Sequence, residues 1–336
     1  METEEKKQFR FGLLGKDISY SFSQGYFGEK FKALGLLDHS YENFDLPQIR
    51  IFPQLLKNEK NLIGLNVTIP YKEAVLPYLA EIDATAAEIG AVNTIQFTER
   101  GLKGFNTDVD GFVESLLPFL PQNQSIKALI LGTGGASKAV AFGLQQLNIP
   151  YVFVSRTSKE NCLTYAELSD NDVANTQLIV NTTPLGMHPK KDECPPLAYN
   201  AITDGHILYD LVYNPAETLF LKKGKAQGAQ IKNGLEMLHI QAEKDFLFAL
   251  LFTNQKNKQA QLSELIASSI FAQAKAQLAF DTDKAIAHYL RLGRLLPNSK
   301  FRANAEFDAA NLLLDEMKWS QAINVLKSFK SHFPKH

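Results

Sequence analysis

Apolar and polar positions follow two different periods along this chain, and the change of period divides it. Up to Gly234, short apolar runs alternate with segments of helical period, which predicts alternating strands and helices. Beyond Gly234 the pattern is helical almost throughout. Glycine follows the same division, because 19 of the 20 glycines lie at or before Gly234 and only Gly293 lies after it. We therefore expect an α/β protein with an all-α C-terminal extension.

The first block runs from about residue 9 to residue 106 and predicts a small α/β sheet. Strands are expected where short runs are apolar or alternate, and a helix where the apolar residues follow a helical period. The expected strands are residues 9–14, 41–44 and 62–67, and the expected helix is 26–34.

The second block has the pattern of a Rossmann-type dinucleotide-binding fold. Residues 128–131 are apolar without interruption, as a buried parallel strand should be, and a glycine-rich turn follows at residues 132–137. A helix is expected from that turn to about Gln146. Further strands are expected at residues 151–154, 178–180 and 207–212.

The last part of the chain is predicted to be helical and contains a short internal repeat. An amphipathic helix is expected at residues 235–251, and an extension of about eighty residues follows. Within it, residues 284–297 match residues 321–334 at a constant offset of 37, and a further helix is expected at 301–314 between them. A period of this size is close to that of helix-pair repeats, so the extension is either tetratricopeptide-like or an ordinary helical appendage.

Composition and charge exclude several classes of protein. The formal net charge is −1, which gives no reason to expect nucleic acid or an anionic membrane surface as a partner. The charged start lacks the apolar run of a signal peptide, and no apolar stretch is long enough to span a bilayer. The two cysteines, Cys162 and Cys194, do not suggest a disulfide framework, so a reducing cytoplasm is expected. Histidine and cysteine show no metal-ligand spacing, so no metal is expected.

The glycine-rich turn predicts a pyrophosphate site. Gly132 and Gly134 allow a tight turn and a close approach of the backbone to a pyrophosphate, while the start of the next helix offers N–H donors. The third position of the fingerprint is Ser137 rather than glycine or alanine. A tight strand-to-helix turn without a ligand is the alternative.

The end of the second strand of this block favours NADP(H) over NAD. An NAD site usually places a carboxylate there to hold the ribose 2′-hydroxyl. The chain instead has Ser155, Arg156, Thr157 and Lys159, whose guanidinium and hydroxyl groups suit a 2′-phosphate. An exposed basic turn with no ligand is the alternative.

Lys72 and Asp108 are the candidates for catalysis, and each follows a strand-like segment. Reduction of a ketone needs a hydride from a nicotinamide and a proton for the developing alkoxide. A lysine fixed beside the carbonyl can supply that proton, and a neighbouring aspartate can hold the lysine and bind a substrate hydroxyl. By itself a lysine is more often a solvated surface residue.

Four motifs in order give these residues a family context. They are residues 66–72 (NVTIPYK), 90–94 (GAVNT), 106–108 (NTD) and 132–137 (GTGGAS). Together they resemble shikimate dehydrogenase, over about residues 9 to 250. The resemblance implies NADPH-dependent reduction of 3-dehydroshikimate to shikimate in aromatic amino-acid biosynthesis, with Lys72 and Asp108 as the catalytic pair.

The resemblance also implies the domains and the binding residues. It implies a substrate-binding α/β domain at residues 1–107 completed by helix 235–252, a Rossmann NADP-binding domain at 108–234, and the helical extension at 255–336. Matching positions imply that the substrate is bound by Ser21, Ser23, Asn66, Thr68, Asn93, Tyr213 and Gln241. They imply that the cofactor is bound by Gly132, Gly134, Gly135, Ala136, Ser137, Ser155, Arg156, Thr157, Thr182, Gly234 and Met237.

Two other functions stay open at this point. One is an NAD-dependent quinate/shikimate dehydrogenase, because the substrates differ little and Glu160 stands where a basic residue is common in the family. The other is a helical-repeat interaction protein with an enzyme-like body, in which the C-terminal helices bind a protein partner or a second copy of the chain.

Overall fold

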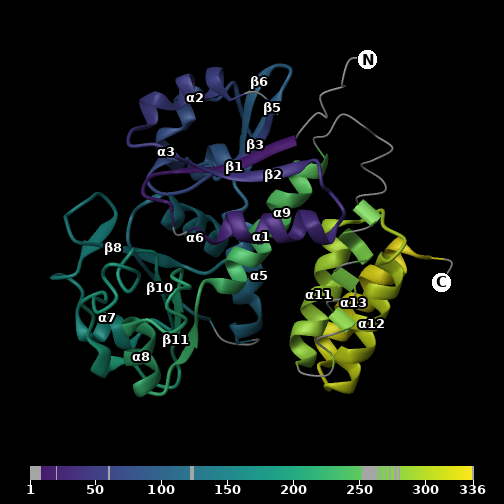
Figure 1. Ribbon diagram of the computed structural model, residues 1–336. Coiled ribbons are helices and arrows are strands. Elements are labelled where there is room, and N and C mark those ends of the chain that lie inside the picture. The colour runs from purple at the N-terminus through teal and green to yellow at the C-terminus, as the bar shows by residue number, and fades with distance from the viewer. Residues whose placement is uncertain are drawn as a thin grey trace, which may run out of the picture. The chain divides into compact units, whose positions relative to one another are not determined.

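The computed structural model describes residues 9–19, 21–59, 61–121, 125–251 and 281–334, together with short stretches between 263 and 278. The charged start and the predicted beginning of the extension at 255 lie outside these ranges. The chain divides into two compact units, Met1–Phe246 and Leu247–His336 (Figure 1).

The N-terminal half of the first unit contains a six-stranded mixed sheet. Its strand order is β2-β1-β3-β5-β6-β4; β1 pairs in parallel with β2 and β3, and β5 is antiparallel to both β3 and β6. The strands are β1 (Phe9–Gly15), β2 (His39–Asp45), β3 (Leu62–Val67), β4 (Glu81–Ile82), β5 (Thr94–Thr98) and β6 (Gly101–Phe105). The helices are α1 (Phe22–Ala33), α2 (Phe52–Asn58), α3 (Tyr71–Ala74) and α4 (Ala84–Ile89).

The sequence pattern predicted β1, β2 and β3 but did not identify the β5–β6 hairpin. The short turn of this hairpin depends on Gly101, whose φ of +115° lies in the left-handed region. A side chain there would also approach the Cβ of Ala80 to 2.8 Å. Helix α1 begins at Phe22, earlier than predicted, because the Ser21 side chain caps it by accepting a hydrogen bond from the Ser23 N–H.

The second sheet of this unit has six parallel strands in the order β12-β11-β10-β7-β8-β9, the doubly wound arrangement expected of a Rossmann-type fold. Its strands are β7 (Ala128–Leu131), β8 (Tyr151–Ser155), β9 (Cys162–Thr164), β10 (Leu178–Asn181), β11 (Ile207–Asp210) and β12 (Gln230–Lys232). Its helices are α5 (Asp108–Leu116), α6 (Gly135–Gln146), α7 (Asp170–Ala174) and α8 (Leu219–Ala226). Strand β11 ends at Asp210, two residues before its predicted end.

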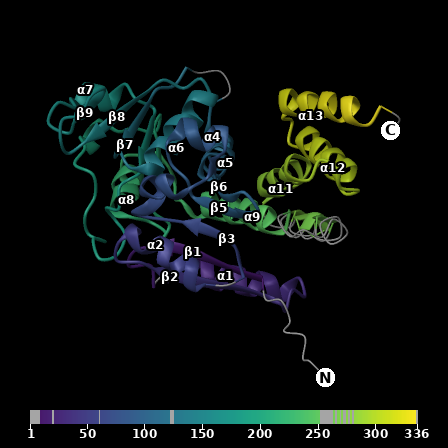
Figure 2. The same cartoon turned by 90° about the horizontal axis from the view of Figure 1, so that it is seen from above.

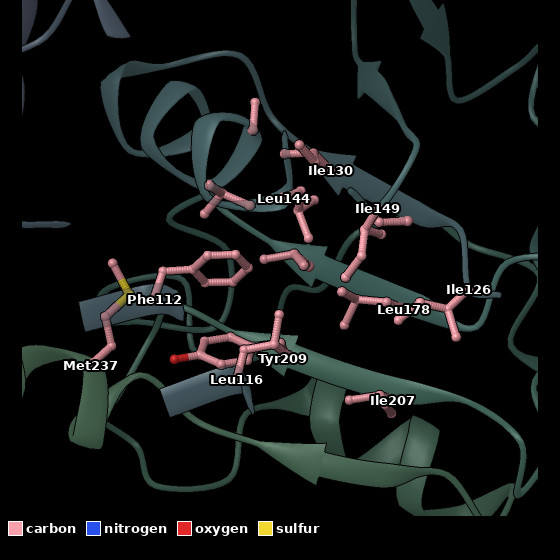
Figure 3. Close-up of a cluster of buried hydrophobic side chains, with 14 residues drawn as sticks. Phe112, Leu116, Ile126, Ile130, Leu144, Ile149, Leu178, Ile207, Tyr209 and Met237 are labelled. Atoms are coloured by element: carbon pink, nitrogen blue, oxygen red, sulfur yellow. The ribbon is translucent and has the colours of Figure 1, made fainter. Parts of the chain in front are cut away.

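Both faces of this sheet are buried, which explains the continuous apolar runs in its strands. Along β7, Ala128 and Ile130 pack in one cluster while Leu129 and Leu131 pack in another on the opposite face. The first cluster includes Phe112 of α5 and Leu144 of α6, with Met237 at its edge (Figure 3). The second cluster includes side chains of α7 and α8.

Helix α9 (Leu235–Leu251) follows β12 and packs closely against α5. A Cβ atom at Gly111 of α5 would lie 2.7 Å from the backbone oxygen of Met237, so glycine permits this close approach of the two backbones. Helix α9 therefore occupies a fixed place beside the start of α5, where Asp108 lies.

The second unit contains α11 (Thr282–Leu295), α12 (Arg302–Asp315) and α13 (Trp319–His332), which lie side by side in Figures 1 and 2. These helices confirm the expected all-α extension, and α11 and α13 cover most of the two copies of the sequence repeat. Among the residues that the structure describes, no helix combines the length and apolar character that crossing a bilayer requires.

Candidate active site

Lys72 and Asp108 form a close ion pair. Lys72 Nζ lies 2.7 Å from Asp108 Oδ2, and the two side chains are 15% and 2% exposed. The pair joins two segments that are 36 residues apart in the sequence. The sequence predicted both residues, and the structure brings them together.

The Lys72 backbone is held from two sides. After β3 the chain turns through Thr68, whose carbonyl accepts a hydrogen bond from the Tyr71 N–H at 2.9 Å. The Tyr71 hydroxyl donates to the carbonyl of Leu46 at 2.6 Å, and the Val92 N–H donates to the carbonyl of Lys72 at 2.8 Å. Lys72 therefore stands on a short helix fixed to the body of the sheet.

Asn93 connects the ion pair to the rest of the mixed sheet. Its Nδ2 donates to Asp108 Oδ1 at 3.1 Å and to Thr107 Oγ1 at 2.8 Å, while its Oδ1 accepts from the Thr107 N–H at 2.9 Å. Asn106 Oδ1 accepts from the Asp108 N–H at 3.1 Å at the start of α5. These contacts fix the position of Asp108, and Lys72 is the cation that pairs with its carboxylate.

Asn66 lies in the same buried hydrogen-bond network. The Tyr41 hydroxyl donates to Asn66 Oδ1 at 2.8 Å, and Asn66 Nδ2 lies 3.4 Å from Thr94 Oγ1. Burial, together with the negative charge of Asp245, raises the pKa of Tyr41 well above its usual range, and a hydrogen bond with Ser23 opposes that rise. Tyr41 was not predicted, because a tyrosine in an alternating strand is an ordinary core residue.

Asp245 is a second polar residue that the sequence did not predict. Its Oδ1 accepts hydrogen bonds from Thr94 Oγ1 at 2.6 Å and from Thr107 Oγ1 at 2.9 Å. Burial raises its pKa to about 7. The sequence could have indicated Asp245 by its position one helical turn after Gln241, because this spacing places both side chains on one face of α9.

The remaining predicted substrate residues lie in four segments: the start of α1, the turn after β3, the loop after β11, and α9. Ser21 and Ser23 stand at the start of α1, where Phe22 contacts the ring of Tyr213 with centroids 6.4 Å apart. Thr68 follows β3, and Gln241 lies on α9; both are partly exposed. Phe22 also stacks on His239 of α9, so the start of α1, Tyr213 and α9 meet.

The glycine-rich turn has the shape that a pyrophosphate site requires. Gly132 has a φ of +114°, and a Cβ atom there would approach Thr182 Oγ1 to 2.6 Å. Gly134 precedes α6, and nothing lies within 4 Å of the position that its Cβ would occupy. The turn is therefore both tight and open at the start of the helix, and it fits a dinucleotide phosphate. Ala136 lies in the first turn of α6.

Several predicted cofactor residues have their side chains engaged within the protein. The Ser137 hydroxyl donates to the carbonyl of Gly134 at 2.6 Å, and the Thr182 hydroxyl donates to the carbonyl of Leu131 at 2.7 Å. Met237 packs in the core cluster and is 6% exposed (Figure 3). A Cβ atom at Gly234 would lie 2.1 Å from the carbonyl oxygen of Leu211.

The turn after β8 is basic and exposed. The Ser155 hydroxyl donates to the carbonyl of Thr157 at 2.6 Å and so shapes the turn, while Arg156 and Thr157 are exposed. Lys159 Nζ donates to Thr133 Oγ1 at 2.6 Å and links this turn to the glycine-rich turn. A phosphate beside the glycine-rich turn would therefore lie near the ammonium group of Lys159, which comes from the turn after β8.

The glycine-rich turn lies directly beside the ion pair. A Cβ atom at Gly135 would lie 3.1 Å from Lys72 Cβ and 3.5 Å from Ala91 Cβ. A second contact between the same elements is the ion pair of Lys138 Nζ with Glu73 Oε2, at 2.6 Å. In the described part of the chain, no cluster of three or more histidine, cysteine, aspartate or glutamate side chains is arranged to hold a metal.

A doubly wound sheet with an open glycine-rich turn, and a lysine–aspartate pair beside that turn, define an oxidoreductase that uses a nicotinamide dinucleotide. The protein-family model described as the shikimate dehydrogenase substrate binding domain matches residues 13–95 of this chain. The chain is 36% identical over 254 residues to shikimate dehydrogenase (NADP(+)) of Methanosphaera stadtmanae. The aligned residues cover 70% of this chain and 89% of that protein. It belongs to the shikimate dehydrogenase family.

Other relatives agree with this assignment. The enzyme of the same name from Carboxydothermus hydrogenoformans is 39% identical over 243 residues, which cover 68% of this chain and 86% of that protein. The structure also resembles that of shikimate 5-dehydrogenase from Thermus thermophilus in complex with NADP(H) and shikimate. That match has a TM-score of 0.63 and 32% identity, and it covers 74% of this chain and 94% of the other.

Proposed function

We propose that this chain catalyses the NADPH-dependent, reversible reduction of 3-dehydroshikimate to shikimate. The observation that carries the proposal is the 2.7 Å ion pair of Lys72 and Asp108 beside the glycine-rich turn. Shikimate dehydrogenases of the family act on this substrate with this cofactor, as the names of the relatives and the Thermus thermophilus complex indicate.

Lys72 is the proton donor in this proposal. NADPH, when bound at the glycine-rich turn, supplies the hydride to the ketone carbon. The Lys72 ammonium group donates a proton to the oxygen of that carbonyl as negative charge develops there, and Asp108 keeps the ammonium group in place. In shikimate oxidation the same amine accepts the hydroxyl proton.

The substrate residues surround this pair in the proposal. Asn93 bonds to Asp108, and Asn66 bonds to Thr94 in the same network. Both are proposed to form hydrogen bonds with ring hydroxyls of the substrate. Ser21 and Ser23, at the start of α1, bind the substrate carboxylate, where the helix N-terminus also favours negative charge. Thr68, Tyr213 and Gln241 complete the site.

Cofactor binding in the proposal divides between backbone and side chains. Gly132, Gly134, Gly135, Ala136 and Ser137 hold the pyrophosphate through the turn and the helix start, since the Ser137 hydroxyl is already engaged. The residues on the adenosine side are Ser155, Arg156 and Thr157, and those on the nicotinamide side are Thr182, Gly234 and Met237.

Lys72→Met tests the catalytic role. We expect kcat for 3-dehydroshikimate reduction to fall by roughly 10²- to 10⁴-fold, which is the range for loss of a general acid. Lys103→Met is the matched control, because Lys103 pairs with Glu81 in the same sheet and takes no part in the site. A Lys72→Met enzyme with near wild-type kcat and a normal fold would refute the proposal.

Arg156→Ala tests the choice of NADP(H) over NAD. If Arg156 binds the 2′-phosphate, the KM for NADP should rise by about tenfold or more, whereas the KM for NAD should change little. Equal effects on both cofactors would favour the NAD-dependent quinate/shikimate alternative. Comparison of kcat/KM for shikimate and quinate then decides the substrate.

The C-terminal helices are proposed to mediate self-association. Ile286 of α11 is 6% exposed, whereas Ile323, at the same repeat position of α13, is 49% exposed. Tyr289 and Leu326 form a second such pair, at 1% and 36%. In the first repeat the ring of Phe271 packs on Tyr289, with centroids 5.2 Å apart. For the exposed face of α13 we propose a second copy of the chain as the occupant. An Ile323→Lys, Leu326→Lys protein should sediment as a smaller species than the wild type; if the wild type is itself monomeric, a different protein partner gains ground.

We also propose that the protein is located in the cytoplasm. Cys162 and Cys194 are free thiols, which suits a reducing compartment. Cell fractionation with a compartment marker tests it.

A further inference from the structure

Asp245 is a buried carboxyl group beside the proposed catalytic pair, and it takes no part in the proton transfer proposed for Lys72. It lies on α9 and is 5% exposed. Among the described residues its hydrogen-bond partners are the neutral hydroxyls of Thr94 and Thr107, at 2.6 Å and 2.9 Å. A buried carboxyl group usually has a cation as its partner, so its place here needs a different explanation.

The two hydroxyls connect Asp245 to Asn93. Thr107 Oγ1 accepts a hydrogen bond from Asn93 Nδ2 at 2.8 Å, and Thr94 Oγ1 lies 3.0 Å from Asn93 Oδ1. The same Asn93 Nδ2 donates to Asp108 Oδ1. Asp245 is therefore linked through Thr107 and Asn93 to the carboxylate that holds Lys72.

Counting hydrogen atoms shows that this network has two arrangements. Each threonine hydroxyl has one hydrogen to donate. When Asp245 is ionised, both hydrogens go to its Oδ1, and Asn93 Oδ1 then accepts only from the Thr107 N–H. When Asp245 is neutral, its own proton goes to one hydroxyl, and the Thr94 hydrogen can turn to Asn93 Oδ1. The protonation of Asp245 thus reaches the amide that orients Asp108.

The charges around Asp245 include both members of the pair. The pKa of Asp245 is raised to about 7. Desolvation is the largest cause and the charge of Asp108 adds to it, whereas hydrogen bonds from Thr94 and Thr107 and the charge of Lys72 lower the pKa. Tyr41 of β2 faces the same carboxyl group. On α9 itself, Lys244 pairs with Asp110 and Glu114, and Glu243 bonds to Tyr26 and Lys30.

We propose that Asp245 is a positioning residue for the Lys72–Asp108 pair: it orients Asn93 through two threonine hydroxyls, and its negative charge favours the ammonium form of Lys72. Because a negative charge stabilises a nearby cation, an ionised Asp245 keeps Lys72 able to donate its proton at higher pH. Because the pKa of Asp245 is raised to about 7, its carboxyl group is mostly neutral at lower pH, so the effect appears mainly on the alkaline side. The inference rests on the proposed role of Lys72 as proton donor.

The test is the pH profile of kcat for 3-dehydroshikimate reduction by the full chain with saturating NADPH. Asp245→Asn has the same shape and no charge. Relative to its own plateau, its activity should fall at a pH lower by roughly half a unit to one unit, or about three- to tenfold at a fixed alkaline pH. Asp245→Glu, which retains the charge, should keep the wild-type alkaline midpoint even if its plateau is lower.

Asp210→Asn is the matched control. Burial also raises the pKa of Asp210 to about 7, but its carboxyl group bonds to Asn181 and Thr218 rather than to the network of Asn93. Its alkaline midpoint should not move. An unmoved midpoint in Asp245→Asn, or an equal movement in Asp210→Asn or Asp245→Glu, overturns the proposal.

Two further outcomes separate the possible failures. If Asp245→Asn does not fold, Asp245→Ser is the second neutral variant. Loss of the fold in both variants would show that the carboxyl group stabilises the fold rather than positions the Lys72–Asp108 pair, and it would also overturn the proposal. If Lys72→Met keeps its activity, the proposed function itself fails. An unmoved midpoint together with an inactive Lys72→Met overturns only the role of Asp245.

Discussion

The ion pair of Lys72 and Asp108 predicts strong energetic coupling between two residues from distant segments. Charges 2.7 Å apart attract by about 6 kcal/mol at an effective dielectric constant of about 20, and desolvation offsets part of this attraction. Lys72→Met leaves Asp108 buried without its cation, and its hydrogen bond from Asn93 does not neutralise the charge. We expect this variant to lose about 3 kcal/mol of its free energy of unfolding.

Asp108→Asn and the double variant complete the cycle. Asp108→Asn should cost less, about 1–2 kcal/mol, because the 15% exposed lysine can still reach water. The double variant has no buried charge at this place, so its loss should be about that of Asp108→Asn alone, and the coupling energy should be at least about 2 kcal/mol. Urea unfolding followed by circular dichroism measures all four proteins, and the contribution of the second unit cancels in the cycle. Losses that add to within about 0.5 kcal/mol would refute the coupling that we infer.

Three further predictions concern stability. Burial raises the pKa of Asp210 and Asp245 from the usual value near 4 to about 7. Between these pH values the folded state therefore binds protons that the unfolded state has lost. The free energy of unfolding should fall as the pH rises from about 4 to 7. In Asp210→Asn, the free energy of unfolding should fall by roughly 2–4 kcal/mol less over this pH range, as measured by urea unfolding at a series of pH values. An unchanged pH dependence would contradict the raised pKa of Asp210. Gly234→Ala should destabilise the protein by about 2 kcal/mol or more, because the added Cβ would meet the Leu211 carbonyl at 2.1 Å, and an unshifted melting temperature would show that the contact can relax. Gly134→Ala, which adds a Cβ in open space, should leave the melting temperature nearly unchanged and instead weaken NADP binding, measured by fluorescence titration.

The local pattern predicted most elements of the fold for a physical reason that the structure shows. Strand β7 is apolar at every position because both faces of its sheet are buried, so its pattern was clear in the sequence. The β5–β6 hairpin was missed because its strands are short and partly exposed and its segment is rich in glycine, which weakens any strand pattern. The predicted division at residues 107 and 108 stays a prediction, since both sheets lie in one compact unit.

The sequence by itself determined the glycine-rich turn, the identity of Lys72 and Asp108 as candidates, and the change from an α/β to an all-α chain at Gly234. These features depend on residue type and on short spacings, which a linear pattern contains. Only the tertiary structure decided that Ser137 and Met237 are turned into the protein, and that Tyr41 and Asp245 join the network of Asn93. Hydrogen bonds between residues more than a hundred positions apart, such as that of Thr94 with Asp245, depend on how sheets and helices pack, and no local period records that packing.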